Sequence, residues 1–81
     1  MELSDVERIR FIELISSLIN FYENLFYQYQ KGVLESELWE GWSNGLFHFL
    51  EKPGVKNWWD KYNALFSKSF RDYIAMHESR A

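Results

Sequence analysis

The stretch VKNWWDKY, residues 55–62, sets two adjacent tryptophans ahead of a tyrosine. Its apolar side chains stand at positions i, i+3, i+4 and i+7, which share one arc of about 100° on an α-helix. They are Val55, Trp58, Trp59 and Tyr62, and Leu65 extends the same arc. Adjacent tryptophans cover both flanks of a buried helical stripe, so the spacing predicts a core helix. A stacking platform for a ligand, or a surface for a partner, is the alternative interpretation.

The chain is short and rich in aromatic residues. Its 81 residues include seven Phe, five Tyr and four Trp, and no Cys. A chain of this length is one domain, residues 1–81, and buries only about 60% of its unfolded surface, so few rings can be left in solvent. Without cysteine it has neither a disulfide nor a thiolate metal site. The fold therefore depends on packing or on a partner, and the cytoplasm is the expected compartment.

Start and stop signals divide the chain into helices. The first helix follows a capping box formed by Ser4 and Glu7 and stops at Gly32. Pro53 suits the first turn of the third helix, and Ser67 can cap the fourth. The predicted helices span about residues 5–31, 36–50, 53–65 and 68–78. Their connections are short, so we expect an all-α fold, a small antiparallel four-helix bundle with one long N-terminal helix and three shorter ones.

Apolar spacing assigns the inner face of each helix. The first helix carries a stripe through Phe11, Ile15, Leu18, Tyr22, Leu25 and Tyr29, flanked by Ile12, Ile19 and Phe26 on one side and by Leu14 and Phe21 on the other. The second is predicted to bury Leu38, Trp39, Trp42, Leu46, Phe49 and Leu50 and to expose Phe47. Because the first helix is about twice as long as the others, its N-terminal half is expected to stay uncovered. The candidate interface is Val6, Ile9, Phe11, Ile12 and Phe47, and its burial in a second copy would make a homodimer.

Charge is distributed unevenly along the chain, whose net charge is −3. Residues 32–51 contain acids and neither lysine nor arginine, and these form a candidate acidic patch of Glu35, Glu37, Glu40 and Glu51. The C-terminal part holds Lys52, Lys56, Lys61, Lys68 and Arg71. A nucleic-acid footprint needs a denser basic surface, and overall acidity argues against one.

No pattern in the sequence indicates catalysis. There is no phosphate loop, nucleophile elbow, metal cluster or dinucleotide fingerprint, so we expect no enzyme, no cofactor and no metal site. His48 with Glu51 could be a ligand pair or a general base, but a histidine beside an acid at the surface explains the spacing as well. His77 lies near a helix C-terminus, where a packed or capping role is expected.

Several turn residues and rings carry a resemblance to a known group of proteins. They are Tyr22-Glu23-Asn24, Gln28-Tyr29, Gly32 and Leu34, Trp39 and Trp42, Pro53-Gly54-Val55, Trp58-Trp59, Phe66-Ser67 and Phe70-Arg71. Over about residues 15–76 the chain resembles the soluble domain of short uncharacterised bacterial proteins that carry an N-terminal membrane segment. The resemblance implies a bacterial source and a domain at the cytoplasmic face of the inner membrane, with no activity to transfer. This sequence contains neither a signal peptide nor a run of about twenty apolar residues, so we expect no transmembrane segment in it.

The expected function is that of a small non-catalytic helical protein-interaction or regulatory module, which binds a protein partner or itself. One alternative is a small acidic inhibitor, for example one encoded by a phage, that blocks a basic site on another protein through the candidate acidic patch. Another is single-stranded nucleic-acid binding through aromatic rings and the C-terminal bases.

Overall fold

Four α-helices form the chain in the computed structural model, which describes residues 5–80. They are α1 (Asp5–Gln30), α2 (Ser36–Leu50), α3 (Pro53–Tyr62) and α4 (Lys68–Arg80), with a short 3-10 turn, η1 (Asn63–Leu65), between α3 and α4. The all-α prediction is confirmed, and residues 5–80 contain no strand. The capping residue Ser4 lies outside the described residues.

The helix ends follow the expected backbone chemistry. Gly32 has a φ of +77°, a left-handed conformation that favours glycine and ends α1. The amide of Gly32 donates to the carbonyl of Tyr29, and the amide of Val33 donates to that of Gln28. Pro53 is the first residue of α3. At the start of α4, the Ser67 hydroxyl accepts a hydrogen bond from the Phe70 amide at 3.3 Å, so the predicted serine cap is present.

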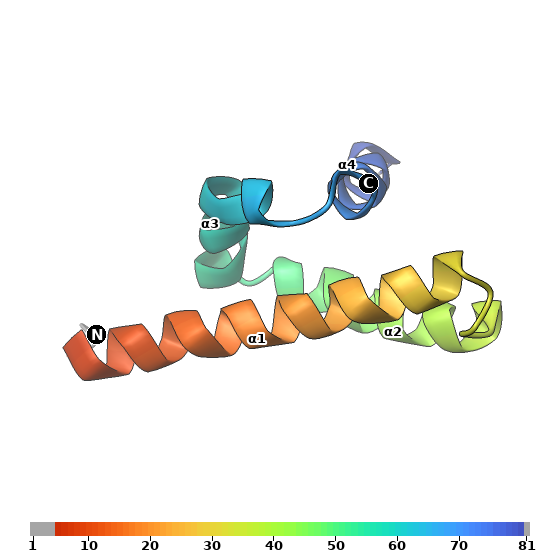
Figure 1. Cartoon of the computed structure of the whole chain (residues 1–81). Coiled ribbons are helices and arrows are strands. Elements are labelled where there is room, and N and C mark those ends of the chain that lie inside the picture. Colours follow the sequence, from red (N-terminus) through yellow and green to blue (C-terminus); the bar gives the residue numbers. More distant parts are fainter. Residues whose placement is uncertain (1–4, 81) are drawn as a thin grey trace.

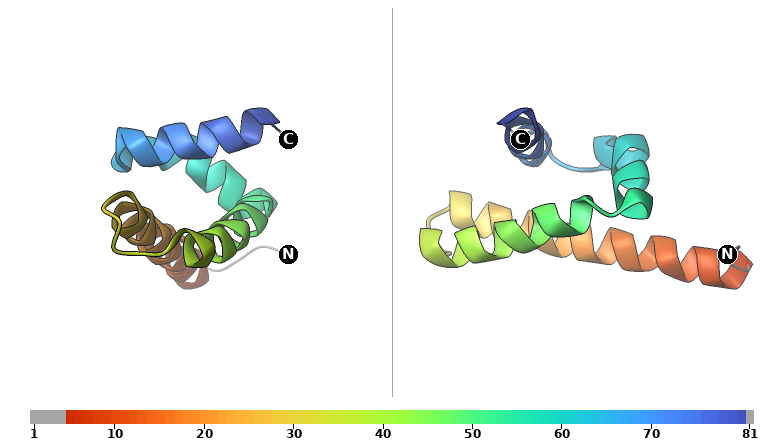
Figure 2. Two further views of the ribbon diagram at one scale, coloured as in Figure 1. Left: turned by 90° about the vertical axis from the view of Figure 1, so that its right-hand side faces the viewer. Right: turned by 180° about the vertical axis from the view of Figure 1, so that it is seen from behind.

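The helices pack as a hairpin crossed by two shorter elements. α1 and α2 lie side by side and antiparallel, and α3 turns away from the end of α2 (Figure 1). α4 is seen end-on in Figure 1 and along its length on the left of Figure 2, so it runs across the hairpin. The antiparallel bundle of four helices is therefore not confirmed, because only α1 and α2 are paired in that way. The turn η1 and the extended Phe66 that follows it redirect the chain before α4.

Aromatic rings fill the space between the hairpin and the crossing helices. Phe26 of α1 is the centre of this cluster, with ring centroids 5.5 Å from Trp39, 5.7 Å from Phe70 and 5.0 Å from Tyr73. Trp59 meets Phe70 edge to face at 5.8 Å. The buried hydrophobic residues are Ile15, Ile19, Phe26, Trp39, Leu46, Leu50, Val55, Trp58, Trp59, Phe66, Phe70 and Ile74. The tryptophans at 58 and 59 thus belong to the core, as their spacing predicted.

The end of the predicted third helix differs from expectation. Tyr62 is partly exposed and Leu65 is 75% exposed, although both were predicted to lie on the buried arc. The α-helix ends at Tyr62, and a 3-10 turn follows. Residues in a 3-10 turn advance by about 120° instead of about 100°, so Leu65 leaves the arc on which α-helical spacing would place it.

The predicted orientation of the second helix is also wrong in part. Its buried residues are Trp39, Ser43, Leu46 and Leu50. Leu38 and Trp42, which were expected inside, are exposed, and Phe47, which was expected outside, is half-buried against the core. The buried stripe of α2 is therefore rotated about the helix axis relative to the predicted stripe. The reason is that Trp39 packs between Phe26 and Tyr29 of α1 and Tyr73 of α4.

Candidate interaction surfaces

The first turns of α1 present apolar side chains to solvent. Val6 is 60% exposed and Ile9 is 57% exposed, and Phe11 and Ile12 are exposed to a smaller degree. This end of α1 projects past α3 in both Figure 1 and the right-hand view of Figure 2. Phe11 was also predicted to lie at the centre of the buried stripe, yet it only leans on the start of α3. Its Cζ would lie 3.2 Å from a Cβ at Gly54.

Phe47 does not share a surface with these residues. Its ring stacks on the imidazole of His77 with centroids 3.5 Å apart and an angle of 8° between the planes. Tyr73 contacts the same ring at 5.8 Å. Together with Leu50 and Glu78, this stack lines a hollow of about 390 Å³ between α2 and α4. Phe47 and His77 therefore connect these two helices, and Phe47 is half-buried, where the sequence predicted an exposed side chain.

A second exposed apolar surface lies on the α1–α2 hairpin. Phe21 and Trp42 are 45% and 44% exposed, and their rings meet edge to face at 5.6 Å. Leu14 lies two turns before Phe21, Leu38 lies one turn before Trp42, and both are exposed. We call these four residues the hairpin face. Helical spacing did not predict this face, because it placed Leu38 and Trp42 inside, although the position of Leu14 and Phe21 at the flank of the first helix was a signal.

The four acidic residues are spread along α2 instead of forming one cluster. Glu35 precedes the helix and Glu51 follows it, so they lie about 24 Å apart along the axis at 1.5 Å per residue. All four are exposed. Glu51 Oε2 is 3.8 Å from His48 Nδ1, and both side chains are in solvent. Among the described residues, Glu35, Glu37 and Glu40 form no ion pair with a lysine or arginine, so their charge is available to a cation outside the chain.

Two of the five C-terminal bases, Lys56 and Lys68, are paired with nearby acids. Lys56 Nζ lies 3.0 Å from Asp60 Oδ1 and 3.0 Å from Glu78 Oε1, linking α3 to α4. Hydrogen bonds to Asp60 and then to Glu78 raise the pKa of the Lys56 ammonium above its ordinary value of 10.5. Lys68 pairs with Asp72 at 2.7 Å. These pairs reduce the positive charge that the C-terminal part could offer to phosphates.

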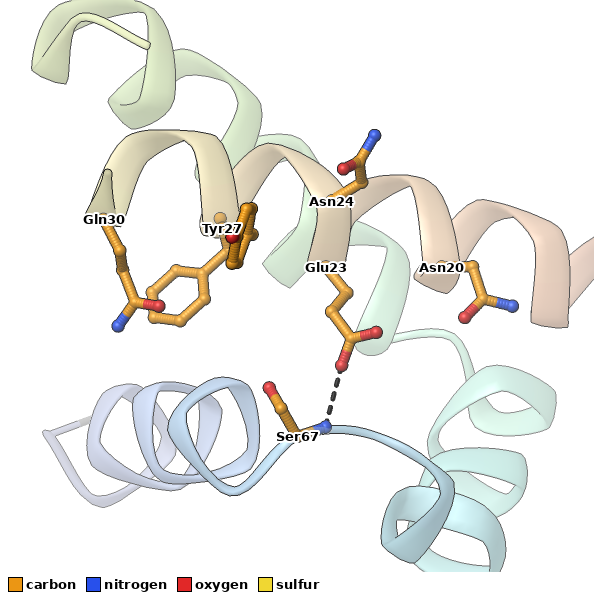
Figure 3. Close-up of a pocket in the computed structure, with 7 residues that line it drawn as sticks. Asn20, Glu23, Asn24, Tyr27, Gln30 and Ser67 are labelled. Carbon is orange, nitrogen blue, oxygen red and sulfur yellow. Dashed lines mark hydrogen bonds between the residues drawn. The ribbon is translucent and has the colours of Figure 1, made fainter. Parts of the chain in front are cut away.

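A polar hollow of about 330 Å³ lies between α1 and the start of α4 (Figure 3). Its side chains come from Asn20, Glu23, Asn24, Phe26, Tyr27, Gln30 and Ser67. The Glu23 carboxylate accepts a hydrogen bond from the Ser67 amide at 2.8 Å, and Figure 3 shows it directed at α4. Glu23 and the Ser67 hydroxyl both accept hydrogen bonds from amides at the start of α4. The polar groups of this hollow therefore hold α4 against α1, and we assign the hollow a structural role.

The arrangement of the described residues bears on metal binding and on membrane crossing. Within residues 5–80, no group of three or more His, Cys, Asp or Glu side chains is arranged to hold a metal ion. None of the helices in that part of the chain combines the length and the apolar character needed to cross a bilayer. Comparison of the chain with protein-family models, curated proteins and solved structures found no match. The fold and its surfaces define a small all-helical protein with an aromatic core and two exposed apolar faces.

Proposed function

We propose that the chain is a small non-catalytic helical protein-interaction module that binds a partner protein through the first turns of α1. The observation that carries the proposal is the exposure of Val6, Ile9 and Ile12 on a helix end that projects past α3. In a chain this small, apolar side chains left in water forfeit stabilisation of about 25 cal/mol per Å². A partner protein that covers these side chains recovers that stabilisation.

The spacing of these residues fits one known mode of helix recognition. Val6, Ile9 and Ile12 recur every three residues and share one broad side of α1, on which Phe11 does not lie. An amphipathic helix binds a partner by laying such a side into an apolar groove. The rings of the core are packed against one another and take no part, so α1 supplies the contact while the rest of the fold holds it rigid.

Two charge substitutions test the proposal. Val6→Glu and Ile9→Glu place a carboxylate at the centre of the surface, and Leu65→Glu places one at an exposed apolar position in η1. Each tagged variant is used to capture proteins from the source cells, and bound proteins are quantified against wild type. We expect one defined protein to be retained by wild type and Leu65→Glu and lost from both α1 variants. Binding that is equal in all four proteins would contradict the proposal.

The acidic side of α2 supports a second candidate, a small inhibitor that covers a basic site on another protein. Glu37 and Glu40 are exposed and have no cationic partner among the described residues. Such binding would depend on salt, because exposed charges are screened beyond a Debye length of about 8 Å at physiological ionic strength. Binding that falls steeply between low and moderate salt, and that is reduced by Glu37→Gln with Glu40→Gln, would favour this candidate over apolar docking by α1.

A further inference from the structure

The hairpin face lies on the side of α1 away from α4. Glu23 points to Ser67 at the start of α4 (Figure 3), and Ile19 is fully buried. Phe21 is two residues from each of them, which is about 200° around the helix. The Phe21–Trp42 ring pair is therefore an apolar surface that α4 leaves open.

Charged side chains are rare in the hairpin sequence around the Phe21–Trp42 pair, whereas Leu38 lies between Glu37 and Glu40. Glu23 is the only charged residue between Leu14 and Gln30, and it is occupied with Ser67 on another side of α1. In α2, the stretch from Gly41 to Leu50 contains no Asp, Glu, Lys or Arg. Depletion of charge with enrichment in Trp and Phe distinguishes the core of a protein interface from ordinary surface.

We infer that a second copy of the chain covers the hairpin face, so that two α1–α2 hairpins pack into a four-helix layer. Leu14, Phe21, Leu38 and Trp42 are each about half exposed, so each leaves about 100 Å² in solvent and one copy offers about 400 Å². Two copies then bury about 800 Å² in total, the size of a weak interface that forms only at high protein concentration.

The shape of the face favours another helix pair over other occupants. A single partner helix needs an open groove. On this surface the Phe21 and Trp42 rings meet between the two antiparallel helices and occupy the groove between them. A membrane surface would require lysines beside the apolar side chains, and neither stretch of the hairpin face carries them. Gly41, next to Trp42, leaves open space where a Cβ would lie, which a side chain of the second copy can enter.

Sedimentation equilibrium of the whole chain from about 5 to about 500 µM tests the inference over the range expected for an interface of this size. We expect wild type to dimerise, and Phe21→Glu and Trp42→Glu to weaken association at least about tenfold, because each would bury an unpaired charge. Ile9→Glu and Leu65→Glu are the matched controls and should dimerise like wild type. Circular dichroism confirms that each variant is folded.

Iodide quenching of wild type provides a readout that needs no variant. Trp42 is the exposed indole, whereas the other three are buried, so the quenched emission should fall as the protein concentration rises. A monomer at every concentration, constant quenching, or a dimer that survives both hairpin substitutions would overturn the inference. Dissociation by Ile9→Glu alone would also overturn it and would assign self-association to the first turns of α1. Loss of a heterologous partner from Ile9→Glu is a separate result, so the proposed function can stand or fall independently.

Discussion

Glu23 of α1 and Ser67 at the start of α4 are joined across 44 residues of chain by a hydrogen bond of 2.8 Å from the Ser67 amide to Glu23 Oε2. The first amides of a helix have no partner within it, and a carboxylate there also interacts favourably with the helix dipole. Glu23 thus acts as a cap supplied by another helix. The other contacts between α4 and the hairpin mainly join side chain to side chain. The contact from Glu23 binds the backbone just before α4, so it fixes where the first turn of α4 lies.

Replacement of Glu23 should therefore destabilise the fold. Glu23→Ala removes the acceptor for the Ser67 amide, and we expect a loss of about 1–2 kcal/mol in the free energy of unfolding by urea. Glu13→Ala is the control, because Glu13 is an exposed carboxylate of the same helix with no interaction among the described residues. Equal effects of the two substitutions would mean that the cap contributes nothing.

The two glycines of α2 should respond differently to alanine. A Cβ at Gly41 would meet no atom within 4 Å, whereas one at Gly45 would lie 3.2 Å from the Tyr22 hydroxyl oxygen. Gly41→Ala should raise stability by about 1 kcal/mol through helix propensity. Gly45→Ala should gain less, because the Tyr22 hydroxyl must shift. Thermal unfolding at low protein concentration measures both.

A double substitution identifies the cause of that difference. In a Tyr22→Phe background the hydroxyl is absent, so Gly45→Ala should recover a gain similar to that of Gly41→Ala. A gain at Gly45 that stays small without the hydroxyl would show that the close contact with Tyr22 is not the reason.

Phe47 should contribute to stability, contrary to the expectation from sequence. Its ring lies between Tyr73 and His77 and connects α2 to α4. We expect Phe47→Ala to cost about 2 kcal/mol in urea unfolding, less than the about 3–5 kcal/mol of a fully buried phenylalanine. Leu65→Ala, at an exposed apolar position, should change stability by less than about 0.5 kcal/mol. If Phe47→Ala left the free energy of unfolding unchanged, the result would favour the orientation of α2 predicted from the sequence, in which Phe47 is exposed.

The positions of the helices could be predicted because local signals define them. Gly32 permits the left-handed backbone that ends a helix, Pro53 fits a first helical turn, and Ser67 is a good cap, each independently of the rest of the fold. The burial of Trp58 and Trp59 followed from their spacing, because the residues between Val55 and Tyr62 that lie off the predicted arc are polar. In such a helix the apolar side is unambiguous.

The face of α2 could not be predicted with the same certainty. Apolar residues occur on nearly every side of it, from Leu38 to Leu50, so periodicity alone cannot select the inner one. The choice is made by partners distant in sequence, namely Phe26, Tyr29 and Tyr73 around Trp39. The crossing of α4 likewise depends on the 3-10 turn, which no distinct sequence pattern predicts.

The candidate surfaces also differ in whether the sequence alone could predict them. Exposure of Val6 and Ile9 follows from the excess length of α1, which is visible in the sequence. The hairpin face depends on the orientation of α2, and the error about Trp42 concealed it. Phe47 was assigned to an interface for the same reason.

Iodide quenching of tryptophan emission at low micromolar protein concentration tests most directly whether the rings form the interior. Trp39, Trp58 and Trp59 are 3%, 8% and 5% exposed, whereas Trp42 is 44% exposed. We expect iodide to reach about a quarter of the emission, since one of the four indoles is accessible and buried rings are shielded from water. Quenching of most or all of the emission in the folded protein would contradict the aromatic core, and with it the account of both exposed faces.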